Sequence, residues 1–512
     1  MPIFSPLKST NWLTYFVAGL VLLLDFYLVV LMYSQGEYLF AILTLVILTS
    51  GIYIFTNKDA YAWRYVYPGM LGMVIFILFP LIATIAIAFT NYSGSNQLAF
   101  ERTVTVLSEQ RYFSGDKYNF SLYPQADNQY RLVLVNPNTE QTLVSDKFNL
   151  AIEKNIAVTE QSLPDGEKAP LKFITQNRAI LQSIKVILPN HNELTMSSLR
   201  QFSEQKARYQ FDNENSVLVN NETGKLYRAN DEIGFFQAID SRGNWLDEKL
   251  EPGYTVTTGI NNFVKIFTDE GIQKPFIQIF IWTVLFSLLT VVFTVLLGMV
   301  LACLVQWDAL KGKAIYRLLL ILPYAVPSFI SILIFKGLFN QSFGEINMIL
   351  NQLFGISPEW FNDPFLAKVM ILIVNTWLGY PYMMILCMGL LKAIPADLYE
   401  ASAMDGASTW QNFSQITFPL LLKPLTPLMI ASFAFNFNNF VLIQLLTNGR
   451  PDMIGTTTPA GYTDLLVSYT YRIAFEGSGT QDFGLAAAIA TIIFLLVGGL
   501  ALLNIKVSKM EL

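Results

Sequence analysis

Eight long apolar segments divide this chain and predict a polytopic membrane protein. Each is close to the length of about 20 residues that a helix needs to cross the hydrocarbon core. The predicted spans are Leu13–Tyr33, Tyr38–Phe55, Pro68–Phe89, Phe276–Val305, Leu318–Leu338, Ala367–Leu391, Phe418–Leu442 and Phe483–Leu503. The fourth is longer than the bilayer requires and is expected to tilt or to project beyond it. We interpret the first as a retained anchor, because a second span follows it at once.

A long polar segment, Tyr92–Pro275, separates the third and fourth spans and carries most of the charged residues. Its pattern predicts a strand at Tyr130–Val135 and a hairpin over residues 217–227. The segment is long enough to bury its own core, so we predict a folded mixed α/β domain. His191 lies among turn-forming residues, and the absence of a second histidine disfavours a catalytic role for it.

Basic residues in the short loops predict the orientation, because Lys and Arg favour the cytoplasmic side. The short loops at 34–37 and 339–366 contain neither residue type. We therefore expect both termini in the cytoplasm and the polar domain outside. The basic residues on the predicted cytoplasmic side are Lys8, Lys58, Arg64, Lys311, Lys313, Arg317, Lys392, Lys423, Lys506 and Lys509.

Composition agrees with a membrane setting and excludes several functions. Hydrophobic residues make up 53% of the chain and charged residues only 14%, against about a quarter in soluble domains. A net charge of −5 argues against a nucleic-acid partner. The two cysteines, Cys303 and Cys387, lie in apolar runs and are expected to pack as small hydrophobes. Neither a disulfide framework nor a Cys/His metal site is expected.

Two prolines interrupt the fifth predicted span. Pro323 and Pro327 each remove a backbone donor and favour a kink. A kinked helix can line a transport pathway or can merely improve packing, and the sequence leaves both interpretations open.

The seventh span has a polar face. Ser432, Phe435, Asn436 and Asn439 follow the i, i+3, i+4, i+7 spacing of one helix face, with Asn438 beside them. Amides inside a membrane are costly unless they pair with another helix or line a wet cavity. Helix–helix pairing remains an alternative for any single amide, whereas a cluster with an aromatic residue favours a cavity.

The sixth span adds an aromatic and polar stretch, Trp377–Tyr382, which we expect Pro381 to break. Aromatic faces against sugar C–H groups and amides bonding hydroxyls would form a site for an uncharged solute. Asp25 is the clear ionisable residue deep within a span, so an ion-driven pathway is disfavoured. The chain also lacks a Gly-x-x-x-x-Gly-Lys-Ser/Thr phosphate loop. A neutral pathway without its own ATPase requires an external motor.

The polar segment between the sixth and seventh spans predicts a short helix. Pro395 fits its first turn, Asp397 suits the positive end of its dipole, and Gly406 is placed to end it. An ordinary loop with a helical turn is the alternative for this segment taken alone.

The same segment resembles the EAA loop of ABC importer permeases, which binds the ATPase subunit. The matching residues are Glu400, Ala401, Ser402, Gly406, Ile416 and Pro419. Two positions depart from the family pattern, with Ser402 for the second alanine and Phe418 for the usual leucine. Both changes are mild in size or polarity.

Three further stretches, Tyr61–Gly69, Ile321–Ile330 and Phe433–Val441, are similar to the larger permease subunits of bacterial maltose and maltodextrin ABC importers. The resemblance covers nearly the whole chain. It implies an α-helical polytopic protein with eight transmembrane helices: a type I importer core of six, two N-terminal helices and a large periplasmic mixed α/β insertion. The implied divisions are 1–67, 68–91, 92–275 and 276–512, with the coupling loop at about 392–419.

The resemblance also implies partners and location. Such a permease works by alternating access with a second permease, two copies of an ATP-binding subunit and a periplasmic maltose-binding protein. It is not an enzyme and binds no cofactor, because the partner subunit hydrolyses ATP with Mg. The implied location is the bacterial inner membrane, with the lipid bilayer and maltose or maltodextrin as the other contacts and no nucleic acid.

The implied site residues fall into two groups, with no catalytic or metal-binding residue. The substrate-binding group is Gly379, Tyr382, Ser432, Phe435, Asn436 and Asn439. The ATPase-coupling group is Glu400, Ala401, Ser402, Met404 and Gly406. A secondary sugar carrier and a membrane-anchored sensor remain the competing functions.

Overall fold

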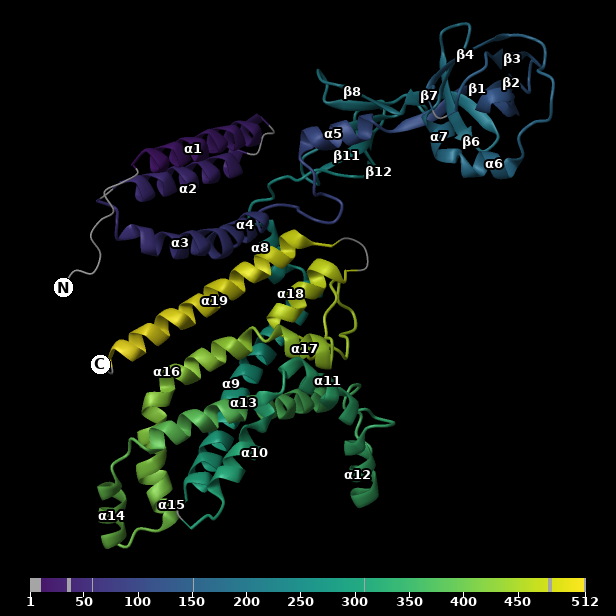
Figure 1. The fold of residues 1–512 in the computed structure, drawn as a ribbon. Helices are drawn as coiled ribbons and strands as arrows, with labels where there is room; N and C mark the ends of the chain where they lie inside the picture. The colour runs from purple at the N-terminus through teal and green to yellow at the C-terminus, as the bar shows by residue number, and fades with distance from the viewer. Residues whose placement is uncertain are drawn as a thin grey trace.

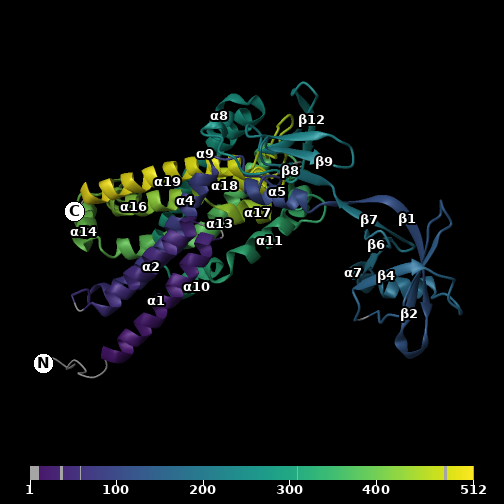
Figure 2. The ribbon, with the colours of Figure 1, turned by 90° about the horizontal axis from the view of Figure 1, so that it is seen from above.

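The computed structural model describes residues 11–34, 38–57, 59–150, 152–307, 309–477 and 481–510. Long helices form an elongated bundle, and a polar β-rich domain extends from one end of it (Figures 1 and 2). The start of α1, the end of α19 and the short helix α14 lie toward the opposite end. The orientation is predicted partly from Lys8 and Lys58, and these two residues lie outside the described residues.

The N-terminal helices α1 (Asn11–Ser34) and α2 (Tyr38–Thr56) pack as a hairpin. The next span is continuous from Trp63 to Ile87. It consists of α3 (Trp63–Met73), a π-helical turn (Val74–Leu78) and α4 (Phe79–Ile87). The helix therefore begins before the predicted start at Pro68, because hydropathy detects apolar length and not the backbone conformation of the aromatic residues ahead of it.

Three long helices form the frame of the bundle: α9 (Glu270–Gln306), α13 (Pro364–Leu391) and α19 (Phe483–Met510). With 37 residues, α9 is longer than a membrane crossing requires, as predicted. The predicted break at Pro381 is wrong, since α13 continues through this buried proline. Packing of α13 against α9 keeps the helix intact despite the missing donor.

The fifth predicted span is broken into α10 (Lys313–Ala325) and α11 (Ser328–Leu338), which meet at 92°. The break lies at Val326, whose backbone is extended, because the residue before a proline avoids the helical region. Pro327 therefore causes the bend, whereas Pro323 remains inside α10.

The seventh predicted span is also broken, so a continuous helix to Leu442 is wrong. Helix α16 (Phe418–Phe437) ends before Asn438, and α17 (Phe440–Leu446) begins after Asn439. The Asn439 side chain caps α17 by accepting a hydrogen bond from the Leu442 amide at 3.4 Å. Asparagine side chains compete with the backbone in this way and favour helix ends over helix interiors.

All eight predicted apolar segments are nonetheless helical in the described part of the chain. Five helices there are long and apolar enough to cross a membrane, and the α10–α11 pair makes a sixth candidate. Helices α1 and α2 contribute two shorter apolar stretches. The predicted fold class, a helical polytopic protein with a large polar insertion, is confirmed. Two further helices, α12 (Glu345–Phe354) and α18 (Leu466–Phe475), lie between spans.

The polar domain contains a closed barrel of strands β1–β7 and a sheet in the order β12-β11-β10-β9-β8. The barrel strands are Arg111–Pro124, Tyr130–Val135, Thr142–Ser145, Asn155–Glu160, Lys185–Ile187, Glu193–Ser198 and Gln201–Ala207. The sheet strands are Tyr209–Asp212, Val217–Asn220, Leu226–Asn230, Phe235–Ile239 and Trp245–Leu250. The short helices are α5 (Phe100–Ser108), α6 (Leu171–Gln176), α7 (Arg178–Ser183) and α8 (Asn261–Thr268).

Local predictions within this domain are confirmed. The predicted strand at Tyr130–Val135 is β2, with the same bounds. The predicted hairpin is β9–β10, in which Leu226 pairs with Val219. His191 lies in the turn between β5 and β6 with a positive φ of 67°.

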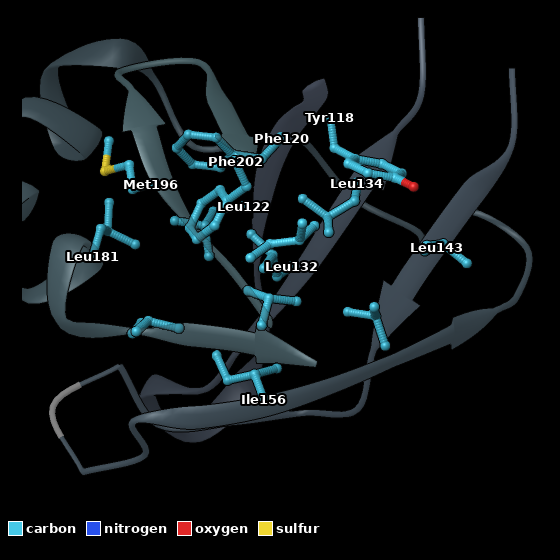
Figure 3. Packing of buried hydrophobic residues seen from close by; sticks show 14 of the residues in the cluster. Tyr118, Phe120, Leu122, Leu132, Leu134, Leu143, Ile156, Leu181, Met196 and Phe202 are labelled. Carbon is cyan, nitrogen blue, oxygen red and sulfur yellow. The ribbon is translucent and has the colours of Figure 1, made fainter. Parts of the chain in front are cut away.

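The barrel is filled by apolar side chains from its strands and from α7 (Figure 3). Phe120 and Phe202 meet edge to face at its centre, with ring centroids 5.0 Å apart. Leu122, Leu134 and Phe202 have no exposed surface. The barrel therefore has a core of its own, separate from the apolar cluster under the sheet.

A two-stranded ribbon joins the barrel to the sheet. The long strand β1 pairs with β7, and the register shifts between Ser114 and Lys117. Gly115 lies in this bulge with φ of 72°, a conformation that favours glycine. Figures 1 and 2 show the barrel held away from the helical bundle by this ribbon.

Buried asparagines anchor the sheet to the bundle. The Asn96 amide donates to the carbonyls of Gly234 and Tyr254, at 2.8 and 3.1 Å. The Asn262 amide donates to the carbonyls of Ala88 and Thr90, at 2.9 and 2.8 Å. These bonds link the end of α4 to the returning chain and fix the base of the polar domain.

Truncation of Phe202 tests the independent barrel core. Phe202→Ala should destabilise the barrel by about 3–5 kcal/mol, because it removes a fully buried ring. Amide hydrogen exchange of the full-length protein in detergent would measure the effect strand by strand. The control is Phe113→Ala, which truncates a half-exposed ring on β1 and should change little. Equal loss of protection in the sheet strands would contradict a separate core.

Candidate functional site

A cluster of polar side chains connects three helices where α16 is interrupted. We call Thr290, Asn375, Asn436 and Asn439 the amide cluster. Asn375 of α13 donates to Asn436 Oδ1 at 2.8 Å and to Thr290 Oγ1 of α9 at 3.1 Å. Asn439 Nδ2 donates to Asn375 Oδ1 at 3.3 Å. Both Asn375 and Asn436 are 5% exposed, so these bonds form away from solvent.

Of the substrate-binding residues predicted on the seventh span, three lie in α16 and one lies beyond its end. Ser432, Phe435 and Asn436 share its helix, and Asn436 Nδ2 donates to the Ser432 carbonyl at 2.8 Å. Asn439 lies beyond the end of this helix. It is connected to Asn436 indirectly, because both side chains are hydrogen-bonded to Asn375. Phe435 points away from the buried amides and is 74% exposed. In this conformation the amides act as helix–helix contacts, one of the two interpretations left open by the sequence.

The predicted residues of α13 occupy two environments. A Cβ added to Gly379 would approach Thr294 Cγ2 to 2.9 Å, so the glycine permits close packing of α13 on α9. Tyr382 is 42% exposed in the isolated chain. The exposed rings of Tyr382 and Phe435 leave apolar surface available for a ligand or a partner subunit.

Sequence reasoning missed Asn375, the residue that connects the cluster. It lies two positions before the aromatic stretch at Trp377. Its spacing supplies a signal, because Asn375, Gly379 and Tyr382 lie at i, i+4 and i+7 on one helix face. Thr290 left no comparable signal, since a threonine in an apolar helix usually bonds its own backbone.

The predicted coupling helix is α14, which runs from Ala396 to Met404 with Pro395 at its N-cap. Its end forms a Schellman motif: the Gly406 amide donates to the Ala403 carbonyl and the Ala407 amide to the Ser402 carbonyl. Gly406 has φ of 75°, which explains a glycine at this position. The predicted helix and its glycine end are both confirmed.

Most of α14 is exposed. Glu400 and Ala401 face solvent, and Met404 is 89% exposed. Ser402 is half-buried and donates to the Tyr399 carbonyl at 2.9 Å. The exposed surface of α14 therefore carries a carboxylate, from Glu400, and an apolar side chain, from Met404.

Asp25, the ionisable residue within the first predicted span, is buried. It is 2% exposed on α1, and its Oδ1 has no hydrogen-bond partner among the described residues. The same part of the chain contains no group of three or more His, Cys, Asp or Glu side chains placed to hold a metal ion.

Three family profiles match successive parts of the chain. The transmembrane helices of the MalF N-terminal region match residues 12–59. The P2 domain of the maltose transport system permease protein MalF matches residues 98–259. The inner membrane component of binding-protein-dependent transport systems matches residues 294–507.

Two MalF permeases match the chain over nearly its full length. The maltose/maltodextrin transport system permease protein MalF of Klebsiella aerogenes is 66% identical over 510 residues, covering 98% of this chain and 99% of that protein. Its counterpart in Escherichia coli K12 is 65% identical over 511 residues, covering 99% of each. A solved bacterial alginate ABC transporter chain has a TM-score of 0.42 and 20% identity, over 49% of this chain and 83% of its own.

The apolar helices, the exposed helix between spans and the family match define a membrane permease of binding-protein-dependent transport, which is a transporter component and not an enzyme. Within that class, the chain belongs to the MalF family of maltose/maltodextrin transport permeases.

Replacing Asn375 tests the connections of the amide cluster. Asn375→Ala should lower stability by about 1–3 kcal/mol, because it leaves Asn436 Oδ1 without its buried donor. Thermal unfolding of the protein in detergent would measure the loss. Thr376→Val is the matched control: it removes a neighbouring hydroxyl that has no partner among the described residues and should be neutral. Equal unfolding temperatures for Asn375→Ala and the unsubstituted protein would contradict these connections.

Proposed function

We propose that this chain is the sugar-binding permease subunit of an ATP-driven importer. It moves maltose or maltodextrin from a periplasmic binding protein into the cytoplasm by alternating access. The observation that carries the proposal is the 65–66% identity to MalF permeases along 98–99% of the chain. The proposed partners are a second permease, two copies of an ATP-binding subunit and the binding protein. ATP and Mg belong to the ATP-binding subunit, and this chain holds no cofactor.

The proposed orientation places both termini in the cytoplasm of a bacterial inner membrane and the β-rich domain in the periplasm. Two observations support it. Lys311, Lys313 and Arg317 lie in the segment between α9 and α10 or at the start of α10, as expected for a cytoplasmic loop. Helix α14 lies toward the end of the bundle opposite the β-rich domain (Figures 1 and 2). A helix that binds an ATPase must face the compartment that contains ATP.

The proposed sugar site lies around the interruption of α16 and uses Gly379, Tyr382, Ser432, Phe435, Asn436 and Asn439. The exposed rings of Phe435 and Tyr382 supply apolar faces for sugar C–H groups. Asn436 Oδ1 uses one of its two lone pairs on Asn375, which leaves the other for a sugar hydroxyl. The amide cluster thus holds its side chains in fixed positions before the sugar arrives.

The proposed motor contact is the exposed face of α14, with Glu400, Ala401, Ser402, Met404 and Gly406 as the coupling residues. Met404 supplies a flexible apolar side chain for a pocket on the ATPase. Glu400 is exposed on the same helix and is proposed to face a basic residue of that subunit. Closure of the ATPase pair would then displace α14 and change which side of the membrane the sugar site faces.

A secondary carrier is the competing mechanism, and it would use Asp25, a buried carboxylate of the first predicted span. Proteoliposomes distinguish the two. Uptake that requires the ATPase, ATP and the binding protein supports the importer, whereas uptake driven by a proton or sodium gradient with this chain alone would overturn it.

Substitution of Asn436 tests the sugar site. Asn436→Ala should reduce sugar uptake by roughly five- to tenfold, the cost of one or two hydrogen bonds, while the ATPase still copurifies. The neighbouring Asn438→Ala removes an exposed amide and should change uptake little. A lower unfolding temperature with unaltered uptake would assign Asn436 a purely structural role.

Reversal of charge tests the docking helix. Glu400→Lys should leave the protein inserted and uncouple ATP hydrolysis from uptake, because it places a cation against the expected basic residue. Vesicle assays of both activities would measure this. Asp405→Lys makes the same charge change at the exposed end of α14 and serves as the control. Normal uptake by Glu400→Lys would refute the docking role.

A further inference from the structure

Helix α14 contacts the rest of its own chain through one narrow face. Only Tyr399 and Ser402, at i and i+3, are even partly buried, and the other residues of α14 are exposed. A force applied to α14 therefore has few side-chain routes into the membrane helices. The Ser402 hydroxyl donates to the Tyr399 carbonyl, within α14 itself. Tyr399 is the residue that reaches beyond the helix.

Tyr399 forms a hydrogen bond to the start of α16. Its hydroxyl lies 2.9 Å from Thr417 Oγ1. Thr417 Oγ1 donates its own proton to the Asn412 carbonyl at 3.3 Å. Either hydroxyl can donate in this pair, and Tyr399 is the donor whenever the Thr417 proton lies on the Asn412 carbonyl. The result is a short chain of hydrogen bonds from α14, through Thr417, to the backbone of the preceding turn.

Thr417 is buried at the junction between a π-helical turn and α16. It is 5% exposed, ends the π-helical turn Asn412–Thr417 and directly precedes α16. Turns of π-helix inside α-helices are frequent at functional sites. Asn436 is on the same helix, about 28 Å further along at a rise of roughly 1.5 Å per residue. Movement of Thr417 along the axis is therefore movement of the helix that carries Ser432, Phe435 and Asn436.

The covalent route between the two helices is more compliant than this contact. After Met404 the backbone passes through Gly406 in a left-handed turn and an exposed loop before α15 (Thr409–Gln411). A glycine turn absorbs rotation at low cost. The hydrogen bond bypasses that turn and holds α14 to α16 directly.

We propose that the Tyr399–Thr417 hydrogen bond is the positioning contact that transmits displacement of α14 to α16, and thereby couples ATP hydrolysis to rearrangement of the sugar site. This inference rests on the proposed function, in which α14 docks on an ATPase. Tyr399 and Thr417 touch neither sugar nor nucleotide. Their role is to keep the docked helix and the sugar-bearing helix moving together.

The test uses the complete transporter in proteoliposomes, with sugar taken up per ATP hydrolysed as the readout. Tyr399→Phe and Thr417→Val each remove one hydroxyl with little change in shape. Both should lower the ratio roughly three- to tenfold, the worth of one hydrogen bond, while the ATPase still copurifies. Thr417→Ser retains the hydroxyl and should restore the ratio. Tyr471→Phe is the matched control, because its hydroxyl has no hydrogen bond among the described residues.

The double variant Tyr399→Phe/Thr417→Val adds a second criterion. If the two hydroxyls act as one contact, the double variant should be no worse than either single variant. An unaltered ratio in Tyr399→Phe, or failure of Thr417→Ser to restore it, would overturn the inference. Failure of the proposed function gives a different result: the unsubstituted complex would then show no ATP-dependent uptake at all.

Discussion

Every backbone polar group of this protein that lies in the membrane must find a partner within the protein, because lipid offers none. The constraint is easily met in the unbroken helices α9 and α13. It becomes demanding at the interruptions of α10–α11 and α16–α17. There, side chains replace the missing helical bonds: Asn439 accepts from the Leu442 amide, and Lys336 Nζ donates to the Leu445 carbonyl at 3.2 Å. The second bond also ties α11 to α17.

The same requirement places polar side chains where a sugar site is proposed. A broken helix in hydrocarbon is tolerated only where protein or a water-filled cavity surrounds it. The amide cluster satisfies that condition from one side, with Asn375 as the common partner of Asn436 and Asn439. Stability of the interruption and the proposed recognition of sugar hydroxyl groups therefore draw on the same few amides. Elsewhere, buried Arg472 of α18 pairs with Asp464 at 2.9 Å and with Asp452 at 2.6 Å, so this buried charge is also matched within the protein.

Features set by local pattern or backbone chemistry were predictable from the sequence. Apolar length located all eight helical segments, the run of strand-favouring residues Tyr130–Val135 located β2, and the need for a positive φ explained Gly406. Features set by competition between contacts were not predictable. Pro381 has the same chemistry as Pro327, yet packing on α9 keeps α13 helical while α10 ends before Pro327. The choice between cavity and pairing for Asn436 depended on Asn375, which lies 61 residues away in sequence.

The barrel is joined to the rest of the polar domain by the β1–β7 ribbon, which contains one β-bulge. The barrel has its own core, and the bulge at Gly115 interrupts the β1–β7 ladder at the barrel end of the ribbon, opposite Ser203 and Glu204. A rotation at the bulge would therefore turn the barrel against the ribbon while the ribbon keeps its position on the sheet.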